Sequence, residues 1–233
     1  MRRLAIIPAR GNSTRLKDKN IYPLGGKPLV RWMTEAVVKS NCFDDVYVST
    51  DSDKIWKTVE NLDVKRHVRP GHHATERATV LKAMLALMEE FEAIGNKYDT
   101  FSYFLPTCPL VTSEDIREGV EKLSIGVDSV ICMTKYSETV QLACIVQGDS
   151  VTPVFDNLTS GLTNSKFIQE YHRPTGAFYM SWWDSLLRDE NFFKGNVKSV
   201  VIPNNRAVDI NNEHDMHLAE FILKKLDEER ACT

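Results

Sequence analysis

A basic loop near the start of the chain carries the residue types that bind phosphate. Residues 9–20 read ARGNSTRLKDKN, with four cations among the ten residues from Arg10 to Lys19. Backbone N–H groups in such a loop form a concave cradle for anions, and arginine adds a forked donor that matches phosphate oxygens. The alternative is a solvated basic loop. Its place directly after a buried apolar run favours phosphate binding.

The loop matches neither of two common nucleotide-binding motifs. A Walker loop requires GxxxxGK[ST], whereas the run from Gly25 to Pro28 lacks the first glycine and the hydroxyl. No GxGxxG follows the first apolar run. The remaining common option is a nucleotidyltransferase of the sugar-activating kind.

Short apolar runs rich in β-branched residues alternate with longer helical patterns, and this order predicts an α/β, Rossmann-like fold. Strands are predicted at 4–8, 46–50, 64–68, 100–105, 129–133, 177–180 and 197–202, and helices at 28–40, 52–59, 77–92, from 113 and after 212. We expect a mostly parallel sheet with helices on both faces. Ligands then lie beyond the carboxyl ends of the strands, where loops follow Pro8, Thr50, Val68 and Leu105.

Residues 140–178 break this rhythm within what we expect to be one domain, 1–233. The run from Leu142 to Val154 predicts antiparallel strands around Gly148 and Asp149, and a polar stretch without a clear period follows from Asp156 to His172. This excursion from the main sheet is interpreted as an interface arm.

Composition excludes several classes of protein. The chain has 233 residues, 42% hydrophobic and 26% charged, with a net charge of −3, so neither a nucleic-acid nor a membrane surface is expected. The apolar run at the start is too short for a signal peptide. The five cysteines are widely spaced without zinc-like pairs, which predicts reduced core thiols and a cytoplasmic location.

Several motifs in order resemble the acylneuraminate cytidylyltransferase family, or CMP-sialic acid synthetases, with their legionaminic, pseudaminic and more distant ketodeoxyoctulosonate relatives. The motifs are 7–13 (IPARGNS), 19–20 (KN), 26–29 (GKPL), 48–51 (VSTD), 69–70 (RP), 106–110 (PTCPL), 171–179 (YHRPTGAFY) and 208–215 (VDINNEHD). The resemblance spans nearly the whole chain and implies a nucleotidyltransferase fold and a homodimer.

The resemblance also implies a reaction. The anomeric hydroxyl of a keto-acid sugar would attack the α-phosphorus of CTP, and pyrophosphate would leave. By position, Arg10 would hold the triphosphate, Lys19 the α-phosphate, and Asn20 and Arg69 the nucleoside. The expected nucleotide-binding residues are Arg10, Gly11, Asn12, Ser13, Arg15, Lys19, Asn20 and Arg69, and the expected catalytic residues are Arg10, Lys19 and Asp209. We interpret Asp51 as the cap of the following helix.

The family's metal motif carries two aspartates that are two residues apart, and here the pair is Asp209 and Asn211. Positions two apart on a strand share a face, so both side chains would reach one magnesium ion. Asn211 offers a neutral and weaker carbonyl oxygen. The alternative is that both residues only shape the turn into the last helix.

The sugar side departs from the family pattern. Leu105 replaces a glutamine, Thr175 replaces an asparagine, and Lys166 would stand in for an arginine. Arg173 is retained and is expected to meet the sugar carboxylate with its fork. Phe192 and Phe193 resemble a pair that packs against an acyl group, or else form an ordinary core pair. These changes indicate the same chemistry on a different acid sugar.

Three alternatives remain open from the sequence. A noncatalytic nucleotide-sensing protein on the same fold is favoured by Asn211, whereas intact Arg10, Lys19 and Asn20 argue against it. A cytidylyltransferase for an octulosonate-type acid is the second alternative. A nucleotidyltransferase for a sugar phosphate is the third, and the segments around Arg173 and Asp209 argue for the keto-acid branch.

Overall fold

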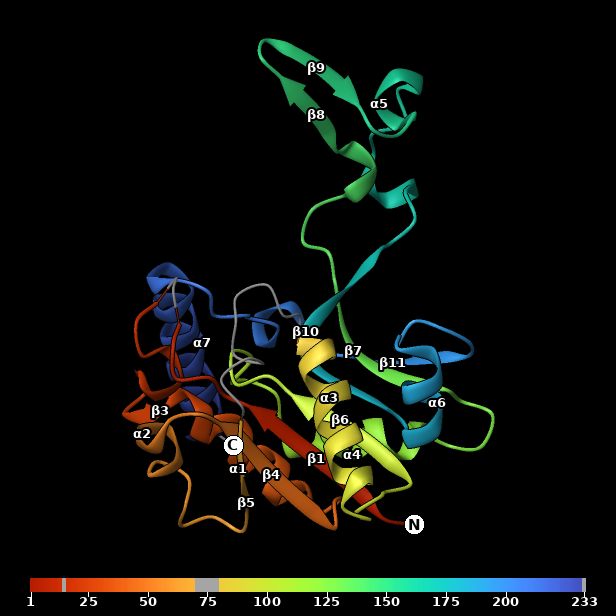
Figure 1. Cartoon of the computed structure of the whole chain (residues 1–233). Coiled ribbons are helices and arrows are strands. Elements are labelled where there is room, and N and C mark those ends of the chain that lie inside the picture. Colours follow the sequence, from red (N-terminus) through yellow and green to blue (C-terminus); the bar gives the residue numbers. More distant parts are fainter. Residues whose placement is uncertain (14–15, 70–79, 232–233) are drawn as a thin grey trace.

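A computed structural model describes residues 1–13, 16–69 and 80–231, and its centre is a seven-stranded sheet (Figure 1). The strand order is β11-β7-β10-β6-β1-β4-β5. The strands are β1 (Arg3–Pro8), β4 (Asp45–Thr50), β5 (Lys65–Val68), β6 (Thr100–Phe104), β7 (Ser129–Lys135), β10 (His172–Trp182) and β11 (Val197–Val201). The prediction of an α/β fold is confirmed.

The sheet is parallel except for one strand. β1 pairs in parallel with β4 and β6, β4 with β5, and β11 with β7. β10 runs antiparallel between β6 and β7. The beginning of β10 therefore lies at the same edge as the carboxyl ends of its neighbours, and Arg173 is brought to the edge where ligands are expected.

Helices cover both faces of the sheet, as predicted. The central strand β1 carries apolar side chains on both of its faces, and both must be buried. Ala5 and Ile7 point into one core, and Leu4 and Ile6 point into the other. The first core is closed by α1 (Leu29–Ser40), α2 (Asp53–Trp56) and α4 (Ser113–Lys122), and the second by α3 (Val80–Ala93) and α6 (Trp183–Asp189). Such two-sided burial is typical of parallel sheets.

A third core cluster joins the last helix to the start of the chain. α7 (Glu213–Ala231) places Met216, Ala219 and Leu223 against Leu24 and Leu29. Leu24 belongs to the small hairpin of β2 (Pro23–Leu24) and β3 (Lys27–Pro28). Among the described helices, none is long and apolar enough to cross a membrane.

The excursion predicted at 140–178 forms an arm, residues 136–171, that projects from the body (Figure 1), whereas residues 172–178 belong to β10 of the main sheet. The predicted antiparallel strands are confirmed as β8 (Cys144–Gln147) and β9 (Ser150–Pro153). Gly148 has a φ of 56° at the turn between them, where a side chain would be strained. The arm also contains η3 (Val140–Leu142), α5 (Asn157–Ser160) and η4 (Ser165–Phe167).

Some predictions about local structure were wrong. The cap of α2 is Ser52, whose hydroxyl accepts from the N–H of Ile55 at 3.4 Å, and Asp51 is engaged elsewhere. Residues 207–211 are not part of a sheet; they connect η5 (Asn204–Arg206) to α7. Helix α3 is described from Val80, and the predicted start at 77–79 lies outside the described residues.

The cysteine prediction holds only in part. Cys108 and Cys132 are buried thiols, whereas Cys42 is half-buried and Cys144 is exposed on β8 of the arm. The prediction of core thiols was therefore wrong for Cys144, because the hairpin that carries it packs against no other layer of the body. Cys232 lies outside the described residues.

Candidate active site

Arg10, Asp51 and Arg69 lie close together where β1, β4 and β5 end. The Ala9 N–H donates to the Ser49 carbonyl at 2.9 Å, and the Arg69 N–H donates to the Thr50 carbonyl at 3.2 Å. Burial lowers the pKa of Arg69, Asp51 opposes this shift, and the nearby positive charge of Arg10 adds to it. The pairing of the strands thus places two guanidinium groups beside one carboxylate, a local excess of positive charge at the predicted phosphate loop.

Asp51 holds the first loop in place. Its carboxylate accepts a hydrogen bond from the Gly11 N–H at 2.7 Å, across forty residues of sequence. A Cβ atom on Gly11 would lie only 2.9 Å from the Cβ of Ser52, so the close approach requires glycine. The sequence interpretation of Asp51 as a helix cap missed this contact, which no local pattern reveals.

Lys19 and Asn20 connect the loop to two other segments. They lie in the short 3₁₀ helix η1 (Lys19–Ile21) and are both buried. The Asn20 amide donates to the Arg10 carbonyl at 2.9 Å, and the Lys19 ammonium donates to the Ile210 carbonyl at 2.8 Å. The second bond brings the predicted α-phosphate ligand next to the segment that carries Asp209.

Asp209 and Asn211 share a side of their segment even though it is not a strand. Val208 and Ile210 are buried in the core, whereas Asp209 and Asn211 are half-buried. The Asn211 amide donates to the Asp209 carboxylate at 2.9 Å. The Ile210 N–H donates to the Thr107 carbonyl at 2.8 Å, which fixes the segment against the turn after β6.

This pair fits a magnesium ion. Magnesium usually keeps several waters and uses one or two protein carboxylates together with substrate phosphates. Asp209 supplies one carboxylate, and the Asn211 amide oxygen is a neutral second donor if the amide turns. Among the residues that the structure describes, no three His, Cys, Asp or Glu side chains gather as a metal cage. Cys108 lies near this pair. Burial raises the pKa of its thiol, and the negative charge of Asp209 raises it further.

Other predicted nucleotide residues line the same loop. Asn12 is exposed, and Gly11 and Ser13 are half-buried. No hydrogen bond or ion pair engages the Arg10 guanidinium among the described residues, so its fork is available to a ligand. Arg15 lies outside the described residues.

On the sugar side, Leu105 and Arg173 lie at the same edge of the sheet. Leu105 follows β6 and its N–H donates to the Ala177 carbonyl of β10 at 2.8 Å. Arg173 is half-buried at the start of β10, opposite Thr134. Both are placed where a substrate beyond the carboxyl ends would lie.

Two other predicted sugar residues, Thr175 and Lys166, lie in different surroundings. Thr175 is buried, and its hydroxyl donates to the Cys132 carbonyl and accepts from the Ala177 N–H. This corrects the predicted sugar contact to a structural role, because both hydrogen bonds are made inside the sheet. Lys166 is exposed on the arm, apart from the edge that carries Leu105.

Phe192 and Phe193 differ in burial and in the residues around them. Phe192 is buried, with its ring centroid 5.6 Å from that of Tyr103 and 5.3 Å from that of Tyr179, whereas Phe193 is exposed. The structure does not bring both rings to one face. Phe192 therefore belongs to the core, which was one of the two sequence interpretations, and it packs against aromatic residues of β6 and β10.

The sequence did not single out Arg206. It lies at the end of η5 and forms a two-pronged ion pair with Asp115 in the first turn of α4. Asp115 also closes a capping box with Thr112. The sequence pointed to the helix start at 113–115, but it carried no signal for the distant arginine.

Comparison with known proteins identifies the class. The family model described as cytidylyltransferase matches residues 4–159. The chain therefore belongs to the cytidylyltransferase family.

Curated relatives narrow the similarity. The chain is 27% identical to a pseudaminic acid cytidylyltransferase of Campylobacter jejuni, over 96% of this chain and 97% of the relative. It is 26% identical to a CMP-N,N'-diacetyllegionaminic acid synthase of Legionella pneumophila, over 96% and 97%. It is 28% identical to an N-acylneuraminate cytidylyltransferase of Escherichia coli, over 97% of this chain and 53% of that relative, so it spans about half of that protein.

Solved structures support the fold. A CMP:2-keto-3-deoxy-manno-octonic acid synthetase complexed with CTP has a TM-score of 0.70 at 13% identity, covering 97% of this chain and 99% of that one. A 4-diphosphocytidyl-2C-methyl-D-erythritol synthase of Anaerococcus prevotii has a TM-score of 0.66 at 16% identity, over 96% and 98%.

Proposed function

We propose that this protein transfers CMP from CTP to the anomeric hydroxyl of a nine-carbon keto-acid sugar and releases pyrophosphate. The observation that carries the proposal is the meeting of three segments: the loop with Arg10, the buried Lys19 and the segment with Asp209. The names of the three curated relatives, all enzymes for nonulosonic acids, support the sugar class.

The proposed chemistry is an in-line displacement at phosphorus. The sugar oxygen forms a bond to the α-phosphorus, the bond from that phosphorus to the β-phosphate oxygen breaks, and the hydroxyl proton passes to solvent. Arg10 binds the triphosphate with its fork, and Lys19 neutralises charge at the α-phosphate. Charge placed in advance in a partly buried site stabilises such a transition state most effectively.

A magnesium ion is part of the proposal as a cofactor. When bound, it would neutralise phosphate charge and align the triphosphate. Asp209 would hold it, with Asn211 as the second donor. The buried neighbours Val208 and Ile210 keep both side chains directed away from the core.

Arg173 is proposed to bind the sugar carboxylate. Leu105 offers an apolar surface at the same edge of the sheet. An apolar side chain here favours a sugar with an apolar substituent over one that needs a hydrogen bond at this point.

We also propose a homodimer formed through the arm, in which Lys166 faces the site of the other copy. The support is the exposed apolar surface of the arm, together with the exposed position of Lys166. A cytoplasmic location is proposed on the buried free thiols Cys108 and Cys132.

One assay tests the proposal. The protein is incubated with magnesium and CTP, UTP or ATP, together with pseudaminic, legionaminic, N-acylneuraminic or ketodeoxyoctulosonic acid or a sugar 1-phosphate, and pyrophosphate is measured. We expect release with CTP and one of the nine-carbon acids. Release with the sugar phosphate, equal release from all three nucleotides, or none at all would sink the proposal.

A further inference from the structure

The segment that carries Asp209 is held at both ends. Downstream, the Ile210 N–H donates to Thr107 and the Asn211 N–H donates to the Asp215 carboxylate at 2.8 Å. Upstream, the chain leaves η5 at Arg206, only three residues before Asp209. The contacts that hold Arg206 therefore fix the point from which the chain runs to Asp209.

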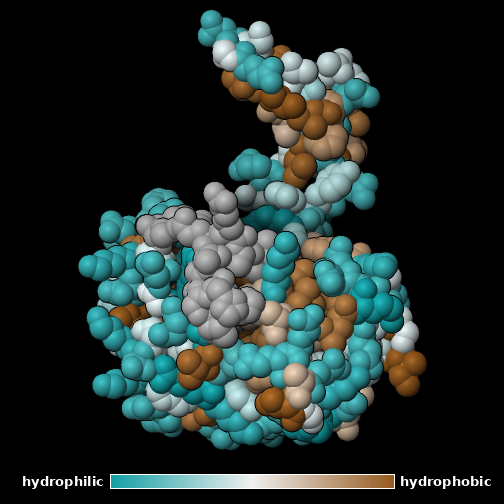
Figure 2. Space-filling model, in the orientation of Figure 1, coloured by the Kyte–Doolittle hydropathy of each residue, from teal (hydrophilic) through white to brown (hydrophobic). Residues whose placement is uncertain are grey.

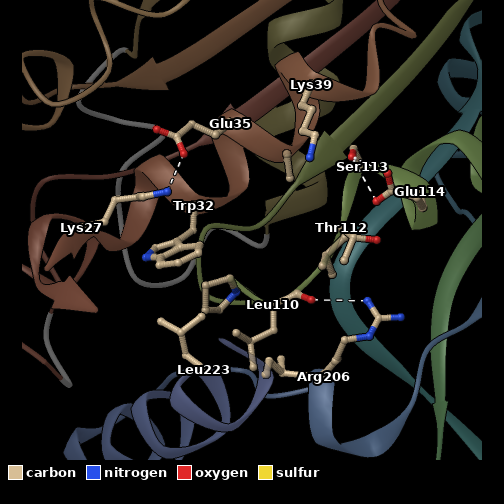
Figure 3. A pocket seen from close by; sticks show the side chains of 14 residues that line it. Lys27, Trp32, Glu35, Lys39, Leu110, Thr112, Ser113, Glu114, Arg206 and Leu223 are labelled. Atoms are coloured by element: carbon tan, nitrogen blue, oxygen red, sulfur yellow. Dashed lines mark hydrogen bonds and ion pairs between the residues drawn. The ribbon is translucent and has the colours of Figure 1, made fainter. Parts of the chain in front are cut away.

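Arg206 is fixed by a two-pronged ion pair. One Nη atom donates to each oxygen of the Asp115 carboxylate, with 2.9 Å for the Nη2 to Oδ1 bond. The Nη1 atom also donates to the Leu110 carbonyl at 3.4 Å, as Figure 3 shows. Both side chains are sheltered, with 20% of Arg206 and 10% of Asp115 exposed. A forked pair that is mostly out of water defines one geometry, which a lysine in the same place would not.

Asp115 is itself rigid. It accepts from the Thr112 N–H at 2.8 Å and from the Thr112 hydroxyl at 2.9 Å as part of the capping box. The first turn of α4 is thus rigid, and the two-pronged ion pair between Asp115 and Arg206 holds η5 in place relative to it. Other side chains in η5 add support, since the Thr134 hydroxyl donates to the Asn204 amide oxygen at 2.7 Å.

We propose that Arg206 is a positioning residue for Asp209, holding the 207–211 segment so that the carboxylate faces the phosphates and magnesium. This inference rests on the proposed function. Residues around a metal ligand that orient it are commonly worth 10- to 100-fold in metal affinity or activity.

The test uses Arg206→Lys and Asp115→Asn, alone and together. A pocket of about 200 Å³ adjoins Arg206 and opens to solvent, so the shorter lysine leaves room for water rather than a sealed void. Arg117→Lys is the matched control. Arg117 lies on the same helix and donates to Glu114, Ser40 and Lys39 at 3.0–3.2 Å, but among the described residues it forms no hydrogen bond or ion pair with η5.

Two readouts are taken. The first is the rise in melting temperature with magnesium at fixed CTP and without sugar, and the second is turnover against magnesium concentration. We expect the magnesium concentration for half-maximal effect to rise roughly tenfold in Arg206→Lys and in Asp115→Asn. The double variant should be no worse than either single one, because both remove one interaction. Arg117→Lys should follow the wild type.

The outcomes separate the inference from the proposed function. Magnesium curves of both variants that coincide with wild type, with only a lower melting temperature, would leave Arg206 a purely structural residue. A wild-type protein without any magnesium-dependent rise also overturns the inference. Normal magnesium shifts with no pyrophosphate from any sugar contradict the proposed function alone.

Discussion

At the scale of single residues, Lys19 has an unusual position. Lys19 is only 9% exposed, and its ammonium donates to the Ile210 carbonyl. Burying an ammonium is costly unless anionic or polar groups compensate. A triphosphate arriving at this loop would supply charged oxygens where the protein supplies a carbonyl. The same residue therefore joins two segments and offers charge to the ligand.

We predict that Lys19→Ala lowers kcat roughly a hundredfold while KM for CTP changes less, because charge near the α-phosphorus matters most in the transition state. Steady-state pyrophosphate release measures both constants. Lys17→Ala is the control, since Lys17 is exposed in the same loop and should keep the wild-type rate. An unchanged kcat with a raised KM would show that Lys19 only binds.

The pair of Asp209 and Asn211 gives a second prediction. Asn211→Asp replaces an amide donor with a second carboxylate next to Asp209, so like charges repel until a cation is bound. We expect a lower melting temperature without magnesium, tighter magnesium binding, and higher turnover when magnesium is limiting. Asp209→Asn should nearly abolish activity. Full activity of Asp209→Asn would place the metal elsewhere.

At the scale of elements, strong periodic patterns were enough to predict most of the sheet. The runs that became β1, β4 and β6 are short, rich in β-branched or aromatic residues, and bounded by turns, and such patterns are readable from local sequence. β10 was predicted only at 177–180, because Pro174 and Gly176 hide the first part of an eleven-residue strand. Neither its length nor its antiparallel direction is a local property.

The proximity of candidate residues was predictable wherever a motif kept them adjacent in sequence. Arg10, Lys19, Asn20 and Asp209 lie on segments that contact one another, through hydrogen bonds from Lys19 to Ile210 and from Asn20 to Arg10. Contacts between distant residues were missed, as with Asp115 and Arg206, 91 positions apart. Asp51 and Ser52 are both good helix caps, and a hydrogen bond from the distant Gly11 decides which one caps α2.

That choice between neighbours gives a prediction about the loop. Asp51→Ala removes the acceptor of the Gly11 N–H, so the phosphate loop should loosen. A hydrogen bond to a charged group is worth about 1.5–3 kcal/mol, so KM for CTP should rise by roughly tenfold or more. Ser52→Ala removes only the cap of α2 and should cost about 1 kcal/mol of stability. Thermal unfolding and CTP titration on both variants check this. Equal effects on CTP would contradict it.

At the scale of the whole molecule, the arm is the feature that a single chain does not explain. Figure 2 shows apolar side chains gathered on it, away from the body. Several are more than half exposed: Ile145, Val146, Val151, Val154 and Phe167. Monomeric proteins rarely expose contiguous apolar surface of this kind. A second copy that covers the hairpin would bury it, and the same arrangement would bring Lys166 toward another site.

The prediction at this scale concerns Val146, which pairs directly with Val151 across the hairpin, both side chains standing on one face. Val146→Asp puts an unpaired carboxylate into the proposed interface of both copies, at a cost of roughly 3 kcal/mol or more. Since each 1.4 kcal/mol is tenfold, dissociation should rise by roughly a hundredfold, and light scattering after size exclusion should report a monomer where the wild type is a dimer. Ile125→Asp is the control, because Ile125 is 96% exposed on the body and precedes β7, whereas the arm begins after the other end of β7. A Val146→Asp protein that stays dimeric, or a wild type that is monomeric at micromolar concentration, would show that the arm is not the interface.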